Sequence, residues 1–208
     1  MSGQPAVSSL QGYYQLHAHI YDATRWTFLF GRAGLIRVAA KRLKPRRILE
    51  IGCGTGKNLT HLARAFPEAQ IVGLDLSADM IAKARKKIEA FGPRVTLLER
   101  AYDAPISAGE PFDLIVFSYC LTMINPGYDQ VLKVCQRDLA PKGSIAVVDF
   151  HDSPIGLFRR WMGVNHVRME GQVLAALQAS GLKLDPCVVR SAYGGVWRWL
   201  TCFASRTS

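Results

Sequence analysis

The chain has 208 residues, of which 49% are hydrophobic and 20% charged, and its formal net charge is +10. These values exclude a disordered chain and fit one globular domain that buries a substantial core. No apolar run reaches the roughly 18 residues that a membrane-spanning helix needs, and residues 1–10 lack the order of a signal peptide. We therefore expect a cytoplasmic protein, and its positive charge predicts an anionic partner, either nucleic acid or anionic lipid.

The first 45 residues read as two helices, broken near residues 21–24, where Asp22 or Thr24 can act as an N-cap. This segment mixes aromatic side chains with cations, which favours a lid that touches an amphipathic substrate or a membrane surface. The alternative is that the aromatic rings pack on the core and the cations are solvated. We therefore divide the single domain into a helical lid, residues 1–45, and a core, residues 46–208. The lid residues in question are Tyr13, Tyr14, Tyr21, Trp26, Phe28 and Phe30, with Arg25, Arg32, Arg37, Lys41, Arg42 and Lys44.

A glycine-rich run, Glu50–Gly56, follows the short apolar run Arg47–Leu49 and precedes a helical stretch. Glycines at alternate positions let the backbone turn sharply and approach a ligand. The next strand-like run ends in Asp75, and an acid there can accept hydrogen bonds from ribose hydroxyls. This arrangement predicts a nucleotide-like cofactor. A dinucleotide site needs G-x-G-x-x-G, whereas position 57 is a lysine, so we disfavour a dehydrogenase.

Strand-like and helix-like runs alternate along the rest of the chain, which predicts an α/β fold with a mostly parallel sheet and helices on both faces. The short Arg190–Gly195 connection suits a hairpin. The expected strands are Arg47–Ile51, Gln70–Leu74, Arg94–Glu99, Phe112–Ser118, Ser144–Phe150, Lys183–Val189 and Val196–Phe203. The expected helices are Lys57–Phe66, Ala78–Phe91, Tyr128–Leu139 and Met169–Ser180.

The five cysteines form no C-x-x-C pair. Buried, reduced thiols are favoured over metal ligands or disulfides, and we predict no metal site. The cysteines are Cys53, Cys120, Cys135, Cys187 and Cys202.

Four motifs together resemble the class I S-adenosylmethionine (SAM)-dependent methyltransferases over roughly Arg46–Phe150: the E-x-G-x-G-x-G run, Gly73–Ser77 with Met80, Asp103, and Pro111–Ser118. The resemblance implies a Rossmann-like, seven-stranded sheet with an antiparallel last strand. It also implies SAM as cofactor and S-adenosylhomocysteine as product. The cofactor-binding residues that it implies are Glu50, Gly52, Gly54, Gly56, Asp75, Leu76, Met80, Asp103 and Ser118.

Four further runs, Tyr13–Trp26, Phe28–Arg32, Ser118–Ile124 and Val147–Phe150, resemble the small bacterial lipid N-methyltransferases. The resemblance implies methylation of a lipid amino headgroup, either diacylglyceryl-homoserine to the trimethyl betaine lipid or phosphatidylethanolamine to phosphatidylcholine. It also implies peripheral association with the anionic inner face of the membrane. The oligomeric state is left open.

Three alternatives stay open beside the lipid acceptor. The first is a methyltransferase for a soluble small molecule, an amine or a quinone precursor. The second is RNA methylation, disfavoured because the residues after Ser118 lack the Asn/Asp-Pro-Pro-aromatic motif that holds a flipped base. The third is a scaffold without catalysis, disfavoured because Glu50, the glycines and Asp75 are all present.

Methyl transfer to an amine needs a proton acceptor, and a methylated ammonium is held well by aromatic faces. An anionic headgroup would be matched by arginines. Each candidate also has a structural interpretation, in core packing, hydrogen bonding or solvated surface charge. The catalytic candidates are Tyr21, Tyr119, His151 and Asp149, and the substrate-binding candidates are Tyr13, Tyr14, His17, Arg25, Arg168 and Arg198.

Overall fold

The computed structural model describes residues 29–124, 127–164 and 167–207. The chain divides into two compact units, Met1–Phe30 and Gly31–Ser208, and every described helix and strand belongs to the second. Several predicted lid residues therefore lie outside the described residues, and their roles stay predictions. These are Tyr13, Tyr14, His17, Tyr21, Arg25, Trp26, Phe28 and the proposed caps Asp22 and Thr24.

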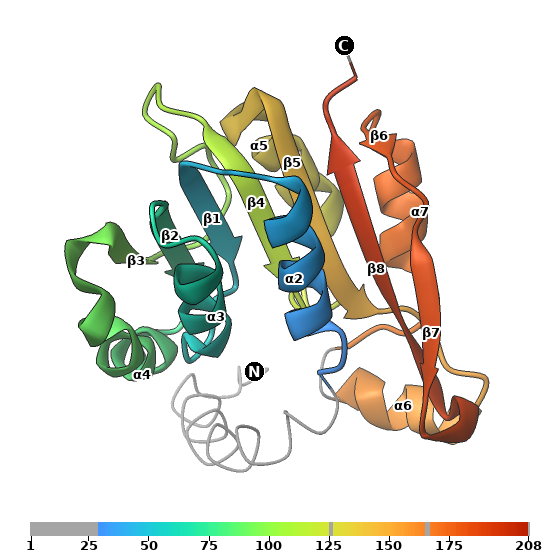
Figure 1. The fold of residues 1–208 in the computed structure, drawn as a ribbon. Coiled ribbons are helices and arrows are strands. Elements are labelled where there is room, and N and C mark those ends of the chain that lie inside the picture. Colours follow the sequence, from blue (N-terminus) through green and yellow to red (C-terminus); the bar gives the residue numbers. More distant parts are fainter. Residues whose placement is uncertain (1–28, 125–126, 165–166, 208) are drawn as a thin grey trace, which may run out of the picture. The chain divides into compact units, whose positions relative to one another are not determined.

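One mixed sheet forms the centre of the second unit, in the order β3-β2-β1-β4-β5-β8-β6, with β7 also paired to β8 (Figure 1). Strands β1 to β5 are parallel, whereas β8 is antiparallel to β5. The predicted α/β sheet with an antiparallel last strand is confirmed. The strands are β1 (Arg47–Ile51), β2 (Gln70–Asp75), β3 (Val95–Glu99), β4 (Phe112–Ser118), β5 (Leu139–Phe150), β6 (Lys183–Leu184), β7 (Val188–Ala192) and β8 (Trp197–Ser205).

Helices cover both faces of this sheet, with α2 and α3 in front of it and α5 and α7 behind it in Figure 1. Central strands covered on both sides read as continuous apolar runs, which explains why β4 is buried at every position except Asp113. Among the described residues, no helix is long and apolar enough to cross a bilayer. The helices are α2 (Arg32–Arg42), α3 (Lys57–Ala65), α4 (Ala78–Ile88), α5 (Tyr128–Asp138), α6 (Gly156–Val164) and α7 (Gln172–Ala179), with the 3₁₀ turns η1 (Glu89–Arg94) and η2 (Tyr193–Gly195).

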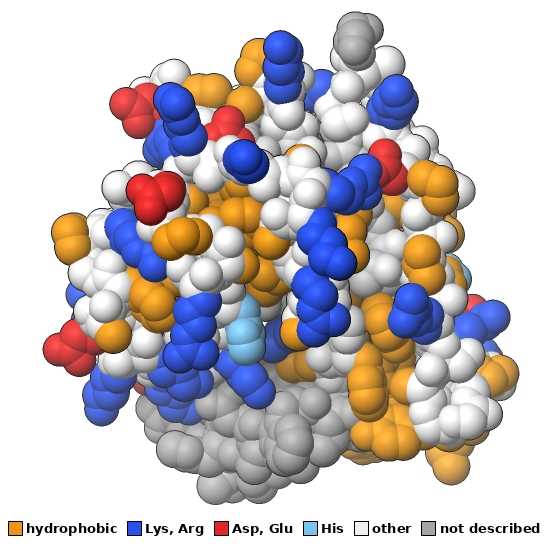
Figure 2. Space-filling view, in the orientation of Figure 1, with side chains coloured by type: hydrophobic (Ala, Val, Ile, Leu, Met, Phe, Trp, Pro, Cys, Tyr) orange, Lys and Arg blue, Asp and Glu red, His pale blue; other side chains and the backbone are white. Residues whose placement is uncertain are grey.

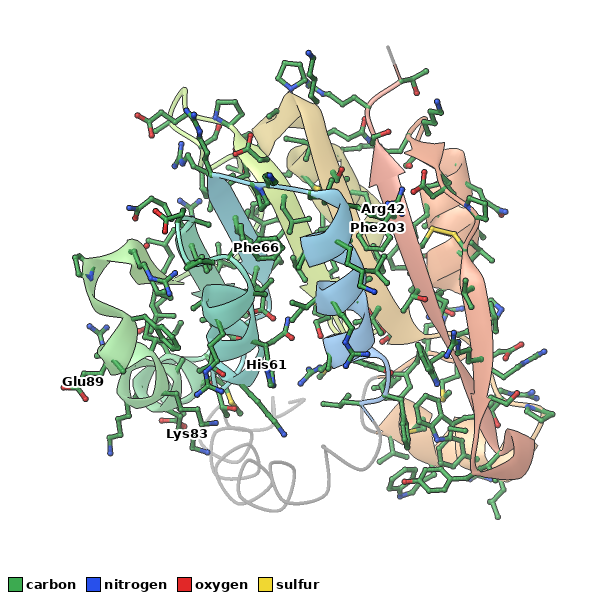
Figure 3. The ribbon with its side chains drawn as sticks, viewed as in Figure 1. Arg42, His61, Phe66, Lys83, Glu89 and Phe203 are labelled. Atoms are coloured by element: carbon green, nitrogen blue, oxygen red, sulfur yellow. A yellow bond between two sulfur atoms is a disulfide. The ribbon has the colours of Figure 1, made fainter. Side chains whose placement is uncertain are left out.

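Helix α2, which the sequence assigns to the lid, packs on the core. It contacts α3 and β5. At its C-terminal end, the Arg42 guanidinium lies 5.1 Å from the centre of the Phe203 ring of β8 and also pairs with Asp185 (Figure 3). Leu35, Ile36 and Ala39 provide the buried side of the helix.

The predicted strand Lys183–Val189 is interrupted, so the described residues form a sheet of eight strands where seven are predicted. Its two parts, β6 and β7, both pair with β8. Pro186 lies between them and has no N–H to donate to a ladder. The predicted hairpin is confirmed, with η2 as its tip and β7 antiparallel to β8.

Two helix predictions differ from the structure. Helix α4 ends at Ile88, before the predicted Phe91, and the 3₁₀ turn η1 follows it. A longer α-helix is prevented because Gly92 adopts a φ of 61° and Pro93 follows it. Helix α6 is not predicted, since Gly156–Val164 spans only nine residues and contains two glycines, which weaken a helical pattern.

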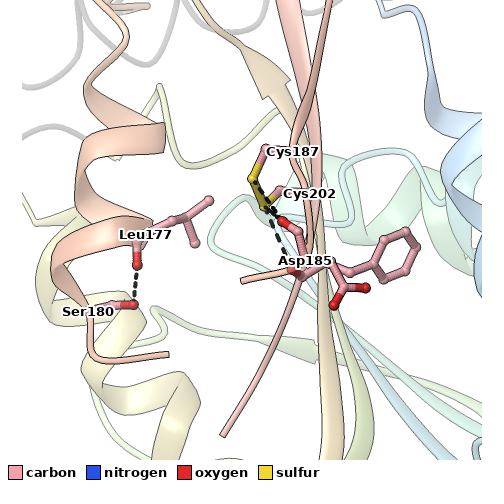
Figure 4. The surroundings of a disulfide bond; sticks show 6 residues. Leu177, Ser180, Asp185, Cys187 and Cys202 are labelled. Atoms are coloured by element: carbon pink, nitrogen blue, oxygen red, sulfur yellow. Dashed lines mark hydrogen bonds between the residues drawn. A yellow bond between two sulfur atoms is a disulfide. The ribbon is translucent and has the colours of Figure 1, made fainter. Parts of the chain in front are cut away.

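The prediction of five reduced cysteines is wrong for two of them. Cys187, the residue before β7, forms a disulfide with Cys202 of β8, close to Leu177 of α7 (Figure 4). The hairpin register pairs Val188 with Thr201, which places the two cysteines directly opposite one another. A cross-strand position of this kind depends on register, which the cysteine spacing alone does not reveal. Cys53, Cys120 and Cys135 are free and buried, as predicted.

Candidate active site

The predicted site residues in the second unit gather at the carboxyl ends of the parallel strands. The strand order reverses between β1 and β4, since β1 continues to β2 on one side and to β4 on the other. In open α/β sheets, ligands bind at this switch point, outside the carboxyl ends of the strands. The glycine-rich loop follows β1 at this edge, and the segment Ser118–Ile124 begins at the end of β4.

The glycine-rich loop is held by close packing as well as by backbone conformation. Gly52, Gly54 and Gly56 have φ values of 68°, 54° and 75°, which L side chains rarely adopt. A Cβ at Gly52 would lie 2.7 Å from Cys120 Cβ, and one at Gly56 would lie 2.9 Å from Ala84 Cβ. Two of the glycines therefore let the loop pack on neighbouring protein segments, in addition to the predicted approach to a ligand.

Asp75, at the end of β2, holds the loop in place. One of its carboxylate oxygens accepts a hydrogen bond from the Gly54 amide at 2.7 Å, and the other accepts from the Ser77 amide at 3.0 Å. Each oxygen keeps a further lone pair, so the carboxylate can still accept hydrogen bonds from a ligand. Asp75 thus links the two motifs that the sequence predicts to bind the cofactor.

Glu50, the last-but-one residue of β1, is 1% exposed. Its Oε1 accepts a hydrogen bond from the Asn58 side-chain amide at 2.7 Å, whereas the buried Oε2 has no partner among the described residues. Burial raises the pKa of this carboxyl to about 8, although the Asn58 hydrogen bond and the charge of Arg32 oppose the shift. A buried oxygen without a partner is rare in folded proteins and indicates a place for a polar or cationic ligand group.

The other predicted cofactor residues are more exposed. Leu76 is 73% exposed directly after Asp75. Met80 lies in the first turn of α4, whose N-cap Ser77 accepts a hydrogen bond from the Met80 amide at 3.4 Å. Asp103 lies in the loop after β3 and pairs with Arg100 at 3.4 Å. Asp75, Leu76 and Met80 thus form one continuous stretch, whereas no described hydrogen bond ties Asp103 to it.

Ser118 ends β4 beside the end of β1, and Tyr119 follows it directly. Ser118 is 1% exposed, and its hydroxyl has no partner among the described residues. Tyr119 has a φ of 57°, and its buried ring packs edge-on against Phe150 at 4.7 Å. The Arg32 guanidinium lies 5.6 Å from the centre of that ring. The ring of this catalytic candidate thus already has a protein cation over it.

Asp149 positions the loop that follows β4. Its two oxygens accept hydrogen bonds from the amides of Leu121, at 2.8 Å, and Phe150, at 2.8 Å, and from the Thr122 hydroxyl at 2.5 Å. Burial raises its pKa to about 6, against the opposing effect of these hydrogen bonds. The sequence allows a proton-accepting role or a loop-capping role, and these contacts are those of a loop cap.

His151 follows β5 at the same edge. Its backbone is fixed, since its N–H donates to Arg198 O at 2.9 Å and its carbonyl accepts from Gly171 N at 2.8 Å. Gly171 also leaves room for the imidazole, because a Cβ there would lie 3.4 Å from His151 Cε1. The buried Nδ1 has no hydrogen-bond partner among the described residues. Of the described catalytic candidates, His151 therefore has a ring nitrogen ready for a ligand.

The two described arginine candidates already pair with carboxylates of the protein. Arg168 pairs with Glu170 at 2.6 Å, and Arg198 forms a two-pronged pair with Asp152. The Asp152 pair raises the pKa of Arg198. The segments of the two acids are joined by an antiparallel bridge between Asp152 and Glu170. An anionic substrate group would have to compete with these acids for either arginine.

Two residues of the site were not predicted from the sequence. Asn58 is buried and bonds Glu50, and its place directly after the glycine-rich loop is a signal that sequence reasoning can use. Arg32 belongs to α2, and its guanidinium donates to the Ser118 carbonyl at 3.4 Å. Arg32 is 86 residues away from Ser118, so no local pattern reveals it.

Much of this edge of the sheet lies in a segment that matches a known family model. Residues 48–143 match a family model described as a methyltransferase domain. This segment contains the glycine-rich loop, Asp75, Asp103 and Ser118. The predictions of a SAM-dependent methyltransferase domain and of SAM as its cofactor are confirmed.

Two individual relatives match parts of the chain. The chain is 36% identical over 115 residues to a demethylmenaquinone methyltransferase of Thermus thermophilus, covering 55% of this chain and 51% of that protein. It is 36% identical over 103 residues to a trans-aconitate 2-methyltransferase of Methylobacterium nodulans, covering 50% and 38%. The chain thus matches about half or less of the length of these two relatives.

A solved structure supports the fold. Phosphoethanolamine N-methyltransferase 2 of Haemonchus contortus, in complex with phosphomonomethylethanolamine and S-adenosylhomocysteine, superposes with a TM-score of 0.75 at 16% identity. The superposition covers 93% of this chain and 58% of that one. At this identity the similarity establishes the fold of the chain and not its acceptor.

Proposed function

We propose that this chain transfers the methyl group of SAM to a small organic acceptor, an amine or a quinone precursor. The observation that carries the proposal is the unpartnered Glu50 carboxyl oxygen beside the loop that Asp75 holds. The two curated relatives described above act on demethylmenaquinone and trans-aconitate, which are small molecules, and this supports a small acceptor.

The residues present fit the cofactor. The remaining lone pairs of Asp75 suit ribose hydroxyls, and the unpartnered oxygen of Glu50 suits a cationic or N–H group. The exposed side chain of Leu76 offers an apolar surface for a purine ring, and Asp103 offers an acceptor for its amino group. SAM supplies an electrophilic methyl group on a sulfonium, so the protein needs no nucleophilic residue of its own.

On the acceptor side, the protein orients the acceptor, excludes water and takes a proton. We assign the proton to Nδ1 of His151, because this buried nitrogen has no described partner. Asp149 is engaged by the loop after β4, and burial raises the pKa of the Tyr119 hydroxyl, which keeps that phenol protonated at neutral pH. Tyr119 can therefore donate a hydrogen bond but cannot serve as the base.

The amino headgroup of a membrane lipid, diacylglyceryl-homoserine or phosphatidylethanolamine, is a second candidate acceptor. It is favoured by the exposed apolar face of α6, where Leu157 is 79% exposed. Such an acceptor would place the enzyme at the anionic inner face of the membrane. RNA is the less favoured acceptor, because the base-holding motif is missing from the segment after β4.

The test incubates the purified chain and methyl-labelled SAM with each acceptor class separately: ethanolamine-type amines, demethylated quinone precursors, and vesicles containing either lipid. Label is counted in the aqueous and organic phases, and the product is identified by mass spectrometry. Label in a soluble amine or quinone product supports the proposal. Label confined to a lipid product would instead support the second candidate acceptor, the amino headgroup of a membrane lipid.

A His151→Gln variant completes the test. Removing a general base costs about 100-fold or more in kcat, whereas SAM affinity by calorimetry should be unchanged. Equal activity of wild type and variant would show that His151 does not accept the proton. Failure to label any acceptor class while SAM binds would overturn the proposed enzymatic function itself.

A further inference from the structure

Helix α6 turns an apolar face toward solvent. Leu157, Trp161 and Val164 are 79%, 51% and 67% exposed, whereas Met162 is 6% exposed and faces the protein. At about 100° per residue, the three exposed side chains fall within roughly 60° of the helix circumference. A surface helix normally turns polar residues outward, so the highly exposed Leu157 and Val164 mark this side of α6 as a candidate contact surface.

The same surface continues onto the tip of the last hairpin. Ile155, just before α6, is 43% exposed, and Tyr193 at the tip is 56% exposed. The two segments are joined by hydrogen bonds, since the Ser153 hydroxyl donates to Val196 O at 2.5 Å and Arg198 N donates to Asp152 O at 2.8 Å. Hydrophobic side chains accordingly gather over α6 and the hairpin tip, at the lower right of Figure 2. We call this surface, Ile155–Val164 with Tyr193, the α6 face.

The charges on the α6 face have one sign. Arg159 and Arg160 are exposed in α6, and the helix contains no acidic residue. At about 100° per residue, Arg160 lies roughly 40° from Val164, at the border of the apolar stripe. Exposed leucine and tryptophan beside arginine are typical of helices that lie in the headgroup region of an anionic bilayer.

From these observations we propose that the α6 face docks the enzyme on an anionic phospholipid bilayer. A second copy of the chain fits the same face less well. In a two-fold dimer each copy of α6 meets the same patch, which brings like charges together without an acid in α6 to match them. The nearby acids Asp152 and Glu170 are already paired with Arg198 and Arg168.

The α6 face borders the candidate active site. Helix α6 follows the carboxyl end of β5, and Asp149 and His151 lie on the segment that leads into it. Figure 1 shows α6 and the hairpin tip at the edge of the sheet toward which the β1 and β4 arrows point. Docking through this face would bring the catalytic edge to the membrane surface. The docking proposal concerns a partner and does not depend on which acceptor is methylated.

The test uses the full chain without SAM or acceptor. Co-sedimentation is measured with vesicles of phosphatidylglycerol and phosphatidylcholine, and with vesicles of phosphatidylcholine alone. We expect binding to the anionic vesicles that added salt weakens. The variant Leu157→Ser/Val164→Ser should weaken this binding by at least about tenfold, and Arg160→Gln by about fivefold.

The matched control is Val188→Ser/Val189→Ser. It also removes two exposed aliphatic side chains, 43% and 38% exposed, but near the opposite end of β7 from the hairpin tip. Its vesicle binding should equal that of wild type. An equal loss in both double variants, or no binding by wild type, would overturn the proposal. So would a lipid-free dimer that only the α6 variant dissociates, because that result assigns the face to a second copy.

A second measurement uses only the wild-type protein, so its result does not depend on whether a variant folds. Hydrogen exchange of Gly156–Val164, measured with and without anionic vesicles, should slow when vesicles are added. Unchanged exchange in α6 alongside vesicle binding would place the contact elsewhere, for example in residues 1–45, and would overturn the assignment to α6. Because no acceptor is present, these outcomes are independent of the labelling experiment.

Discussion

The two sides of the candidate site are built in different ways. On the cofactor side, the loop Glu50–Asn58 and the segment Asp75–Met80 come from neighbouring strands and bond one another. On the acceptor side, the loop after β4, the end of β5 and the start of β8 are joined across the sheet. The cofactor side therefore joins segments of one strand-helix-strand unit, whereas the acceptor side joins segments from three strands, β4, β5 and β8.

The largest expected effect concerns the protonation state of the Glu50 carboxyl on the cofactor side. The pKa of Glu50 is raised to about 8 from 4.5, so the folded state binds its proton more tightly than the unfolded chain. Its stabilising contribution is present below pH 4.5 and is lost as the pH rises toward 8. Glu50→Gln mimics the protonated acid, so its stability relative to wild type should rise across that window by on the order of 4 kcal/mol.

Urea unfolding between pH 4.5 and 8.5 measures this difference, with the Asn58 partner left unchanged. SAM affinity at pH 8.5 should fall in the same variant, because the amide carries no charge to pair with a cationic group. A stability difference that does not vary with pH would show that Glu50 is ionised in the folded protein, and it would remove the proposed cation site.

The next largest effect is expected at Asp75, whose hydrogen bonds hold the cofactor side together. Asp75→Ala removes the acceptor of the Gly54 and Ser77 amides as well as the predicted ribose contacts. We expect SAM affinity to fall by about 100-fold by calorimetry, which corresponds to about 2.7 kcal/mol. Asp79→Ala is the matched control, because Asp79 is an exposed acid four residues further along. Wild-type affinity in Asp75→Ala would refute the ribose assignment.

The difference between the two sides also decides what the sequence reveals. The glycine-rich loop and Asp75 are separated by one strand and one helix, so spacing alone identifies them. The loop cap at Asp149 contacts Leu121 across 28 residues, and Arg32 reaches Ser118 across 86. These contacts require the sheet order and register, which spacing does not supply. The predicted strands are therefore close to the observed ones, whereas the contacts that join the segments of the acceptor side become visible only in the structure.

The smallest expected effect concerns the disulfide of the last hairpin, which supports the acceptor side. Cys187 and Cys202 are 15 residues apart, and a loop of this length gives at most about 3 kcal/mol in the chain-entropy model. Because the unfolded chain can retain part of the hairpin, we expect about 2 kcal/mol, or a melting temperature about 5 °C lower on reduction. The variant Cys187→Ser/Cys202→Ser should melt like reduced wild type and should not respond to reductant.

Free thiols at both positions in non-reduced protein, detected by alkylation and mass spectrometry, would show that strand pairing alone holds the hairpin. In that case the acceptor side, like the cofactor side, would need no covalent link.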